Sequence, residues 1–447
     1  MTSKRFAEIN RLESKFTRSR YRFLAGLRRL SFILLFHLTV FLYRIFEIVA
    51  AFMPFVIISL PLAACLAFRK LLTGVPVFKQ SRIYGKGGGE LVIKLFNLSS
   101  SFHQKLFLFY HVIRGELAIT GLSLREYGDK NLVLGDGYLL ANKPGIFNLW
   151  YVRESSKIAH EGKQAIEWEY VFRRNFISDL MLMLKSLPAY FYHEDDIDFA
   201  VEVNLFDIIF KNYAMGEAVE EVMQSRGQGD PKTVYYVNPD CFNKMFADHD
   251  YFNVLQQGDY VFPDGIGVHV GCKILRTPLK ENINGTDMFP FVCRMAEQQG
   301  FSLYLLGGKP GVADKMGQRL QRDYPALEVA GVMNGYFDQE LESREVVEKI
   351  NSSGADLLFV AFGAPLQEKW IAAHKQSLQV GTIFGVGGLF DFVSGNIKRA
   401  PRWMREIGME WFYRFTREPG RMWKRYFVGN PLFILRVLRW KYFSFGK

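Results

Sequence analysis

The chain has 447 residues, of which 49% are hydrophobic and 15% aromatic. This composition excludes a disordered or collagen-like protein, and the length predicts two or three domains. The net charge of +11 is concentrated at the ends: residues 1–30 carry +7 and residues 400–447 carry +8, which leaves −4 between them. An acidic body argues against a nucleic-acid-binding core, whereas basic ends suit an anionic membrane surface.

The few cysteines indicate a reducing, cytoplasmic setting. There are only four, none is part of a CxxC pair, and a chain of this size does not need disulfides. Cys65 follows Leu62-Ala63-Ala64, as in a lipoprotein cleavage site, but it lies too deep in the chain for a signal peptide. We therefore expect Cys65 to be a packed membrane residue.

The most apolar segment, residues 31–68, is expected to enter the membrane. A spanning helix needs about 20 apolar residues, so one span, two short spans or a helical hairpin would fit. Arg44 and Glu47 should pair internally or lie at an interface, because each would cost roughly 3 kcal/mol at the bilayer centre. Pro54 and Pro61 break the second half. Basic residues flank both ends, so the positive-inside rule favours a broken, re-entrant helix that enters and leaves on the cytoplasmic face.

Four sequence motifs lie within and after this segment. They are Tyr43-Arg44-Ile45-Phe46-Glu47, Gly74-Val75-Pro76-Val77-Phe78-Lys79-Gln80-Ser81-Arg82, Arg114-Gly115-Glu116-Leu117-Ala118-Ile119-Thr120-Gly121 and Lys143-Pro144-Gly145-Ile146. Over residues 40–195 the chain thereby resembles the bacterial polyprenyl-phosphate sugar-1-phosphate transferases. The resemblance implies an α-rich, membrane-associated domain.

This first domain departs from that family where the chemistry would occur. Gln104 and Lys105 stand in place of the family's Asp-Glu pair, and neither can serve as a carboxylate nucleophile. Residues 121–124 read Gly-Leu-Ser-Leu, so the arginine of the family's Gly-Pro-Arg-Pro stretch is also missing. We therefore predict a degenerate, non-catalytic anchor, and we expect the glycines of residues 85–89 to form a plain turn.

From about residue 202 the pattern becomes that of an α/β domain. Strand-length apolar runs alternate with amphipathic segments of helix length, which predicts a parallel sheet covered on both faces. The expected strands are residues 234–237, 260–262, 303–306, 357–360 and 382–384, and the expected helices are residues 287–299, 312–323, 342–351 and 367–376. Ligands bind such sheets at the carboxyl ends of the strands.

Each expected strand ends in residues that could contribute to a site. In chain order they include Asn238, Asp264, the loop glycines Gly307, Gly308 and Gly311, then Gln367 and Asp391. The glycine loop is a phosphate candidate, because glycines allow close approach and the following helix presents free N–H groups to an anion. It is not a GxGxxG motif, so a dinucleotide-binding fold is not indicated, and no metal-binding motif occurs.

Asp264 lies in a Pro-Asp-Gly turn at a strand end. A lone aspartate there is usually a turn residue. Opposite a phosphate loop, its carboxylate could instead take a proton from an attacking hydroxyl. The residues alone leave both interpretations open.

A second set of motifs runs almost without interruption through residues 202–430. It comprises Phe262-Pro263-Asp264-Gly265-Ile266-Gly267-Val268, Asn284-Gly285-Thr286-Asp287, Gly335-Tyr336-Phe337, Gly363-Ala364-Pro365-Leu366-Gln367-Glu368-Lys369-Trp370, Gly385-Val386-Gly387-Gly388-Leu389-Phe390-Asp391-Phe392, Arg399-Ala400-Pro401 and Glu410-Trp411-Phe412-Tyr413-Arg414. These motifs resemble the WecG/TagA/CpsF glycosyltransferase family.

That resemblance implies a Rossmann-like glycosyltransferase that inverts the anomeric centre without a metal or other cofactor. The donor would be a nucleotide sugar, often UDP-N-acetylmannosamine, and the acceptor a sugar on polyprenyl diphosphate. By position, Asp264 resembles the general base, and Asn238, Gln367 and Asp391 resemble polar site residues. Two departures stand out. Asn282 replaces a frequent arginine, whose role would pass to Lys280, Lys309 or a tail arginine, and Tyr236 replaces a smaller residue, so sugar specificity could differ.

The tail, residues 401–447, combines eleven basic residues with four tryptophans. At 100° per residue, Arg414 and Arg421 fall on a basic arc and the aromatic residues on another, which suits a helix lying at a membrane interface. Pro419 is expected to start a new helix. In the resembled family the corresponding appendage docks on the membrane and supplies arginines to the site, and the alternative is an ordinary packed helix with a solvated charged face.

We therefore expect four parts: a basic segment (1–30), a membrane-anchored transferase-like domain (31–200), an α/β glycosyltransferase domain (201–400) and a docking tail (401–447). The predicted function is an inverting glycosyltransferase of bacterial polysaccharide biosynthesis, on the cytoplasmic face of the inner membrane. Its partners would be a nucleotide sugar, a polyprenyl-diphosphate-linked sugar and membrane lipids, with no nucleic acid; homo-oligomerisation stays open. The alternatives are a bifunctional enzyme that also transfers sugar 1-phosphate, and a non-catalytic scaffold of a polysaccharide assembly complex.

Overall fold

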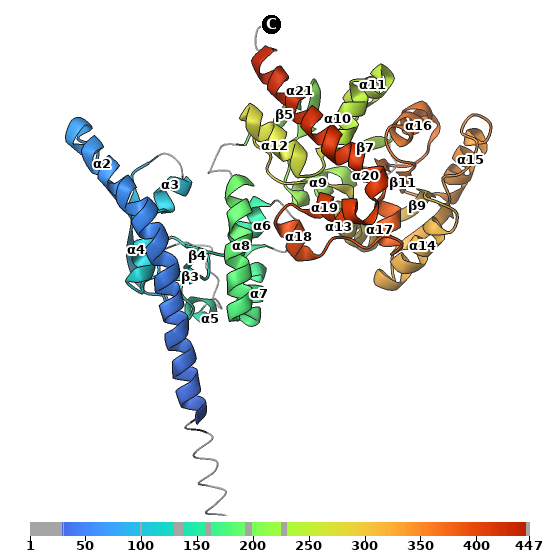
Figure 1. Ribbon diagram of the computed structural model, residues 1–447. Helices are drawn as coiled ribbons and strands as arrows, with labels where there is room; N and C mark the ends of the chain where they lie inside the picture. The colour runs from blue at the N-terminus through green and yellow to red at the C-terminus, as the bar shows by residue number, and fades with distance from the viewer. Residues whose placement is uncertain are drawn as a thin grey trace, which may run out of the picture. The chain divides into compact units, whose positions relative to one another are not determined.

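The computed structural model describes residues 29, 31–98, 101–128, 137–156, 162–192, 199–224 and 230–443 (Figure 1). The chain divides into two compact units. The first comprises Met1–Trp150 and Gln164–Met183, and the second comprises Tyr151–Lys163 and Leu184–Lys447. The basic segment predicted at residues 1–30 lies outside the described residues, apart from Arg29.

The first 200 residues form one long apolar helix, small pairs of strands and short helices. The long helix, Ser31–Thr73, includes a π-helical turn, η1 (Phe55–Ser59), and helix α2 (Leu60–Thr73). Strand β1 (Phe78–Tyr84) pairs antiparallel with β2 (Glu90–Phe96), and β3 (Ala118–Thr120) pairs parallel with β4 (Gly145–Phe147). The remaining helices are α3 (Ser101–Lys105), α4 (Leu108–Ile113), α5 (Gly137–Leu140), α6 (Leu149–Ser155), α7 (Lys163–Arg173) and α8 (Phe176–Tyr192).

The long helix is long and apolar enough to cross a membrane. Its π turn lies between Pro54 and Pro61, where the missing proline N–H groups disturb the regular hydrogen bonding, and the chain stays helical through both prolines. The internal pairing expected for Arg44 and Glu47 is confirmed, with Nη1 and Oε2 3.0 Å apart. Arg44 Nη2 also donates to the Val112 carbonyl at 2.7 Å, so the charges of Arg44 and Glu47 are satisfied within the first unit.

The glycines of residues 85–89 form the turn of the β1–β2 hairpin, as predicted. The Gly85 N–H donates to the Gly89 carbonyl at 2.8 Å, and the Gly88 N–H donates to Gly85 at 3.1 Å. These amides are engaged within the turn and are not free to bind a phosphate.

The second unit is built on a six-stranded, all-parallel sheet, which confirms the predicted α/β class. Its strands are β7 (Lys232–Val237), β8 (Tyr260–Pro263), β9 (Ser302–Gly307), β10 (Glu328–Met333), β11 (Leu357–Ala361) and β12 (Thr382–Gly385). Their spatial order is β10-β9-β11-β12-β7-β8. All five predicted strands are present, and β10 is an additional strand at one edge.

Alternate residues of each strand face two separate hydrophobic clusters, one on each face of the sheet. Val234 and Tyr236 face the cluster formed with α9 (Met215–Met223), α13 (Gly285–Gln299), α14 (Val312–Asp323) and α17 (Leu389–Val393). Tyr235 and Val237 face the other cluster, formed with α10 (Pro239–Met245), α11 (His249–Gln256), α12 (Ile266–Leu275), α15 (Ser343–Ser353), α16 (Leu366–His374) and the hairpin β5 (Glu202–Leu205) and β6 (Ile208–Lys211). Figure 1 shows these helices around the sheet.

The tail folds as a series of short helices and one longer one. They are α18 (Arg402–Glu406), α19 (Glu410–Arg417), α20 (Pro419–Trp423), a π-helical turn η3 (Lys424–Gly429) and α21 (Asn430–Phe443). Pro419 starts a new helix, as expected. Phe433 and Val437 of α21 are fully buried in the second hydrophobic cluster, so the end of the tail belongs to the core as well as to the surface.

Candidate active site

The sheet has a topological switch point at the carboxyl ends of β9 and β11. These strands are neighbours, yet β9 connects to β10 on one side while β11 connects to β12 on the other. Ligands bind at such a switch point in open α/β sheets. The loops after both strands, which contain the predicted glycines and Gln367, therefore border the expected ligand position.

The structure brings the predicted residues Asn238 and Asp264 together. They follow the adjacent strands β7 and β8, and Asn238 Nδ2 donates to Asp264 Oδ2 at 3.3 Å. The Asn238 side-chain oxygen caps α10 by accepting from the N–H groups of Asp240 and Cys241 at 3.1 and 3.2 Å. Because the cap fixes the amide oxygen, the amide nitrogen is directed at the carboxylate of half-buried Asp264.

Asn282, which stands where the family often has arginine, supports the turn that carries Asp264. Its side-chain oxygen accepts from the Gly265 N–H at 2.7 Å. Gly265 has a φ of +88°, a conformation that favours glycine, and it directly precedes α12. Asn282 therefore fixes the backbone beside the candidate base and supplies no positive charge.

The glycine loop between β9 and α14 has the geometry of an anion-binding loop. Gly307 has a φ of +144°, and a Cβ atom there would lie 2.6 Å from the Ala361 carbonyl oxygen, so only glycine fits. The Gly308 N–H donates to that same Ala361 carbonyl at 3.0 Å. Within the described chain, the backbone N–H groups of Lys309 and Gly311 have no acceptor. They lie just before the twelve-residue helix α14, whose N-terminus favours negative charge.

The structure gives Gln367 a supporting position between two loops. Its side chain is 3% exposed, and Oε1 accepts from the N–H groups of Gly363 and Gly387 at 3.1 and 2.8 Å. Its Nε2 donates to Glu368 Oε1 at 2.8 Å. Gln367 thus joins the loops that follow β11 and β12, and its amide is largely engaged by protein groups.

Glu368 was not predicted as a site residue. Its carboxyl is almost fully buried, and Oε2 has no hydrogen-bond partner within the described chain. Burial raises the pKa of Glu368 to about 7. Its place beside Gln367 in the sequence gave no sign of this, because burial of a glutamate is set by tertiary packing.

Asp391 and Arg414 lie on elements that touch each other. The guanidinium of Arg414 stacks over the ring of Phe392, the residue after Asp391, at 4.7 Å from the ring centre. Arg414 Nε is buried without a hydrogen-bond partner, and the Asp391 carboxylate has none within the described residues. The side chain of Arg421, the other predicted tail arginine, lies outside the described residues.

Arg425 was missed by the sequence analysis and lies on the part of the tail that contacts the helix capped by Asn238. Burial alone would lower its pKa, but attraction to Tyr426, Asp240, Cys241 and Asp264 raises the pKa of Arg425. The residue belongs to the π-helical turn η3, which contacts α10. A regular helical repeat, which predicted the basic arc, does not hold through a π turn.

An ion pair and a neighbouring glutamate connect the tail to helix α13 within the second unit. Asp287, in the first turn of α13, accepts from Arg399 Nη1 and Nη2 at 2.5 and 2.8 Å. Burial alone would raise the pKa of Asp287, but the Arg399 guanidinium lowers it. The Arg399 Nε also lies 3.4 Å from Glu410 of α19, so this buried pair connects α13 to the tail.

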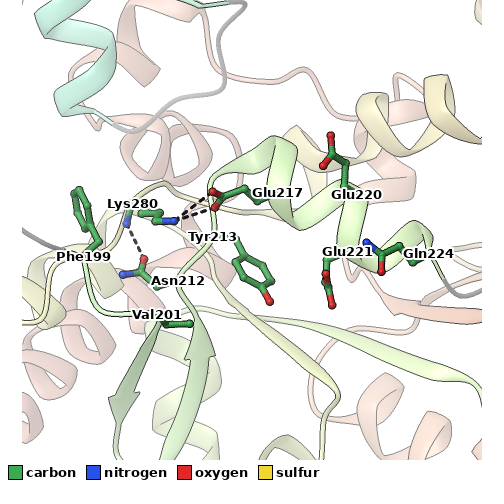
Figure 2. Close-up of a pocket in the computed structure, with 9 residues that line it drawn as sticks. All are labelled: Phe199, Val201, Asn212, Tyr213, Glu217, Glu220, Glu221, Gln224 and Lys280. Carbon is green, nitrogen blue, oxygen red and sulfur yellow. Dashed lines mark hydrogen bonds and ion pairs between the residues drawn. The ribbon is translucent and has the colours of Figure 1, made fainter.

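The other proposed cations are placed differently. Lys309 is exposed beside the glycine loop. Lys280 pairs with Glu217 at 3.0 Å and borders a pocket of about 260 Å³ that also contains Glu220 and Glu221 (Figure 2). A donor diphosphate would be repelled by these glutamates, so Lys280 is poorly placed to hold one.

Tyr236 is a core residue in this structure. It is 9% exposed, and its hydroxyl donates to the Met288 sulfur at 3.1 Å. Burial, followed by the nearby Asp264 charge, raises the pKa of Tyr236. Tyr236 precedes Asn238 by two residues on β7 and packs in the hydrophobic cluster on one face of the sheet.

Residues 203–446 match the model of the glycosyl transferase WecG/TagA/CpsF family. The chain belongs to this family. Residues 1–202 lie outside the match, and so does the predicted transferase-like domain. Among the described residues, no group of three or more metal-binding side chains gathers as a ligand set.

Two relatives carry the same name, N-acetylglucosaminyldiphosphoundecaprenol N-acetyl-beta-D-mannosaminyltransferase. The protein of Bacillus subtilis (strain 168) is 36% identical over 204 residues, which are 45% of this chain and 77% of the relative. That of Staphylococcus aureus (strain MW2) is 29% identical over 246 residues, or 54% of this chain and 93% of the relative. The predicted glycosyltransferase class is therefore confirmed.

Proposed function

We propose that this chain transfers an N-acetylmannosaminyl group from a UDP-sugar to N-acetylglucosaminyl-diphospho-polyprenol, with inversion at the anomeric carbon. The observation that carries the proposal is the pairing of Asp264 with Asn238 at the strand ends of a family member. The names of the relatives support the donor and acceptor sugars. They give no support to a bifunctional enzyme or to a scaffold.

In the proposed reaction, Asp264 takes the proton of an acceptor hydroxyl as that oxygen attacks the anomeric carbon. Asn238 orients the carboxylate. The bond from the anomeric carbon to the UDP oxygen breaks, and negative charge develops on the leaving diphosphate. The free amides of Lys309 and Gly311, the α14 N-terminus and a tail arginine are the groups available to stabilise that charge.

The first 200 residues serve, in this proposal, as a non-catalytic membrane anchor on the cytoplasmic face. The apolar helix Ser31–Thr73 supports membrane insertion by its length and composition. The internally satisfied pair Arg44 and Glu47 and the π turn between two prolines are compatible with the re-entrant form. The predicted domain boundaries and the docking role of the tail are part of the same proposal.

The experiment is to incubate the full chain in nanodiscs with N-acetylglucosaminyl-diphospho-polyprenol and, separately, UDP-N-acetylmannosamine, UDP-N-acetylglucosamine and UDP-glucose. Mass spectrometry should show one added N-acetylhexosamine from the first donor alone. Preference for another donor would overturn the sugar assignment. Absence of transfer from every donor would overturn the acceptor assignment or the catalytic role.

A further inference from the structure

Helix α8 presents its apolar side chains to the outside. A helix of a soluble domain buries its large apolar residues and exposes its polar ones. In α8 the pattern is inverted: Asp179 and Ser186 are buried, at 1% and 0% exposure, whereas Ile177 is 72% exposed and Leu184 54%. Such an inversion indicates that the outer side of α8 faces an environment less polar than water.

The exposed side chains of α8 form one stripe. They recur at intervals of three and four residues and therefore lie on one side of the helix. The stripe consists of Phe176, Ile177, Leu180, Met181, Leu184 and Leu187. Soluble monomers rarely expose a contiguous apolar patch of this kind unless it contacts a partner or a membrane.

Phe176 makes the stripe continuous with the long apolar helix. Its ring lies edge-on to Phe46, with the ring centres 5.1 Å apart, and 6.3 Å from the ring of Tyr43. The long helix has the same inverted pattern, since Glu47 is buried while Phe41 is exposed. The exposed apolar surfaces of the two helices therefore meet at Phe176, and one lipid bilayer could cover both.

A buried polar cluster fixes the rotation of α8. Asp179 accepts from the hydroxyl of Tyr43, from the Tyr170 hydroxyl at 2.9 Å and from Arg174 Nε at 3.1 Å. Rotating the helix so that the stripe became buried would break these hydrogen bonds. The buried donors that now pair with the Asp179 carboxylate would then lack an acceptor, which is costly. The outward direction of the stripe is therefore fixed by the buried side of α8.

We propose that α8 docks into the same lipid bilayer as the long helix, lying along the boundary between head groups and hydrocarbon. This inference rests on the proposed membrane association. A spanning helix needs about 20 apolar residues, whereas α8 has 17 residues in all and carries the charged Asp179 on its inner side, so it lies in the membrane plane. Arg173, just before the helix, is largely exposed and is placed to contact anionic head groups.

The test uses the full chain with Cys65→Ser, because Cys65 is exposed while the other three cysteines are buried. Ile177→Cys, Leu184→Cys and Phe41→Cys are each labelled with bimane and placed in phosphatidylethanolamine–phosphatidylglycerol nanodiscs. Ser352→Cys, at an exposed position on α15, is the aqueous control. Doxyl-labelled lipids should remove most of the emission at positions 177 and 184, and aqueous iodide should remove little.

Each other outcome has a defined meaning. Quenching of the 177 and 184 labels by iodide, as at Ser352, would place the stripe in water and overturn the inference. Protection from both quenchers would place a protein surface, such as a second copy of the chain, on the stripe and also overturn it. Lipid quenching at Phe41 alone would leave the membrane association standing while α8 docking fails. Iodide quenching at Phe41 as well would overturn membrane association itself.

Discussion

Asp264 stands at the end of β8, and among the described residues its carboxylate has one side-chain hydrogen-bond partner, the Asn238 amide. Asp264→Asn keeps the size and the turn but removes the proton acceptor, so kcat should fall about 10²–10⁴-fold with the fold intact. Steady-state kinetics with the lipid acceptor measures this, and circular dichroism checks the fold. Asp250→Asn, at an exposed carboxylate in the first turn of α11, is the matched control and should keep full activity. Near-normal turnover of Asp264→Asn would show that Asp264 only forms the turn and does not act as the base.

Arg425 belongs to η3, which contacts the helix capped by Asn238, and attraction to Asp264 is one of the causes that raise the pKa of Arg425. We expect Arg425→Met to lower kcat about 10²–10³-fold, the cost typical of losing one donor to a developing oxyanion. Arg425→Lys keeps the charge and should recover part of the rate. Arg417→Met, at an exposed arginine of α19, is the control. An effect on KM alone would mean that Arg425 binds the ground state and does not stabilise the leaving group.

Glu368 makes stability depend on pH in a direction opposite to that of most carboxylates. Burial raises its folded-state pKa to about 7, above the ordinary value of 4.5, so the folded protein binds the proton more tightly. The free energy of unfolding should therefore fall as the pH rises from about 4.5 to about 7, by at most about 3 kcal/mol. Glu368→Gln stays neutral and should melt higher than wild type at pH 8 but not at pH 5. Equal melting differences at both pH values would contradict the buried, titrating carboxyl.

At the scale of elements, the pair Asp287–Arg399 determines where the tail lies. Asp287 is buried and Arg399 is 24% exposed. Arg399→Ala would leave Asp287 with the Asn284 amide at 2.7 Å and Arg405 at 3.9 Å, so the loss should stay below the roughly 3–5 kcal/mol of a fully buried pair. We expect faster proteolysis within α18 and α19, because Arg399 also contacts Glu410. The double variant Asp287→Leu with Arg399→Met should recover much of the stability. Arg344→Ala, in an exposed pair on α15, should change neither measurement.

The elements that the sequence predicted well are those whose burial is uniform. The five predicted strands are buried on both faces and appear as continuous apolar runs. Strand β10 was missed because Ala330 and Gly331 interrupt a half-exposed edge strand. The β5–β6 hairpin was missed because its turn uses Phe206 and Asp207 at φ of 57° and 63°, where glycine or asparagine would have been the signal.

The candidate site was predictable where it depends on strand ends. Asn238 and Asp264 follow adjacent parallel strands, so their meeting follows from topology. Arg425 and Glu368 were not predictable, because one reaches the site from far along the chain and the other is buried by packing. Gln367 was predicted from its motif as a site residue, and its hydrogen bonds to two loops suggest that it positions them.

At the scale of the whole molecule, the tail cannot be removed to test its docking role. Phe433 and Val437 are fully buried, and burying such side chains contributes roughly 1.5–3 kcal/mol each. A truncation at residue 403 would therefore lower stability and activity together. Single substitutions at exposed or site-facing residues of the tail change activity without removing the buried side chains that stabilise the fold.

The division of labour between the two units gives the last prediction. Gln104 and Lys105 occupy the positions of a carboxylate pair in the resembled sugar-phosphate transferases, and Gln104 Nε2 is tied to the Leu98 carbonyl at 2.6 Å. Neither side chain can form an acyl-phosphate intermediate, so the first unit should supply no chemistry. The double variant Gln104→Ala with Lys105→Ala should therefore retain wild-type glycosyl transfer at equal membrane occupancy.

A second assay tests the wild-type chain for sugar-phosphate transfer. Given polyprenyl phosphate and a radiolabelled UDP-sugar, the chain should yield no polyprenyl-diphosphate sugar in the lipid extract. Asp264→Asn, assayed beside them, should lose glycosyl transfer, which shows that the assay detects a lost catalytic group. Formation of a polyprenyl-diphosphate sugar that disappears in the double alanine variant would assign catalysis to the first unit and make the enzyme bifunctional.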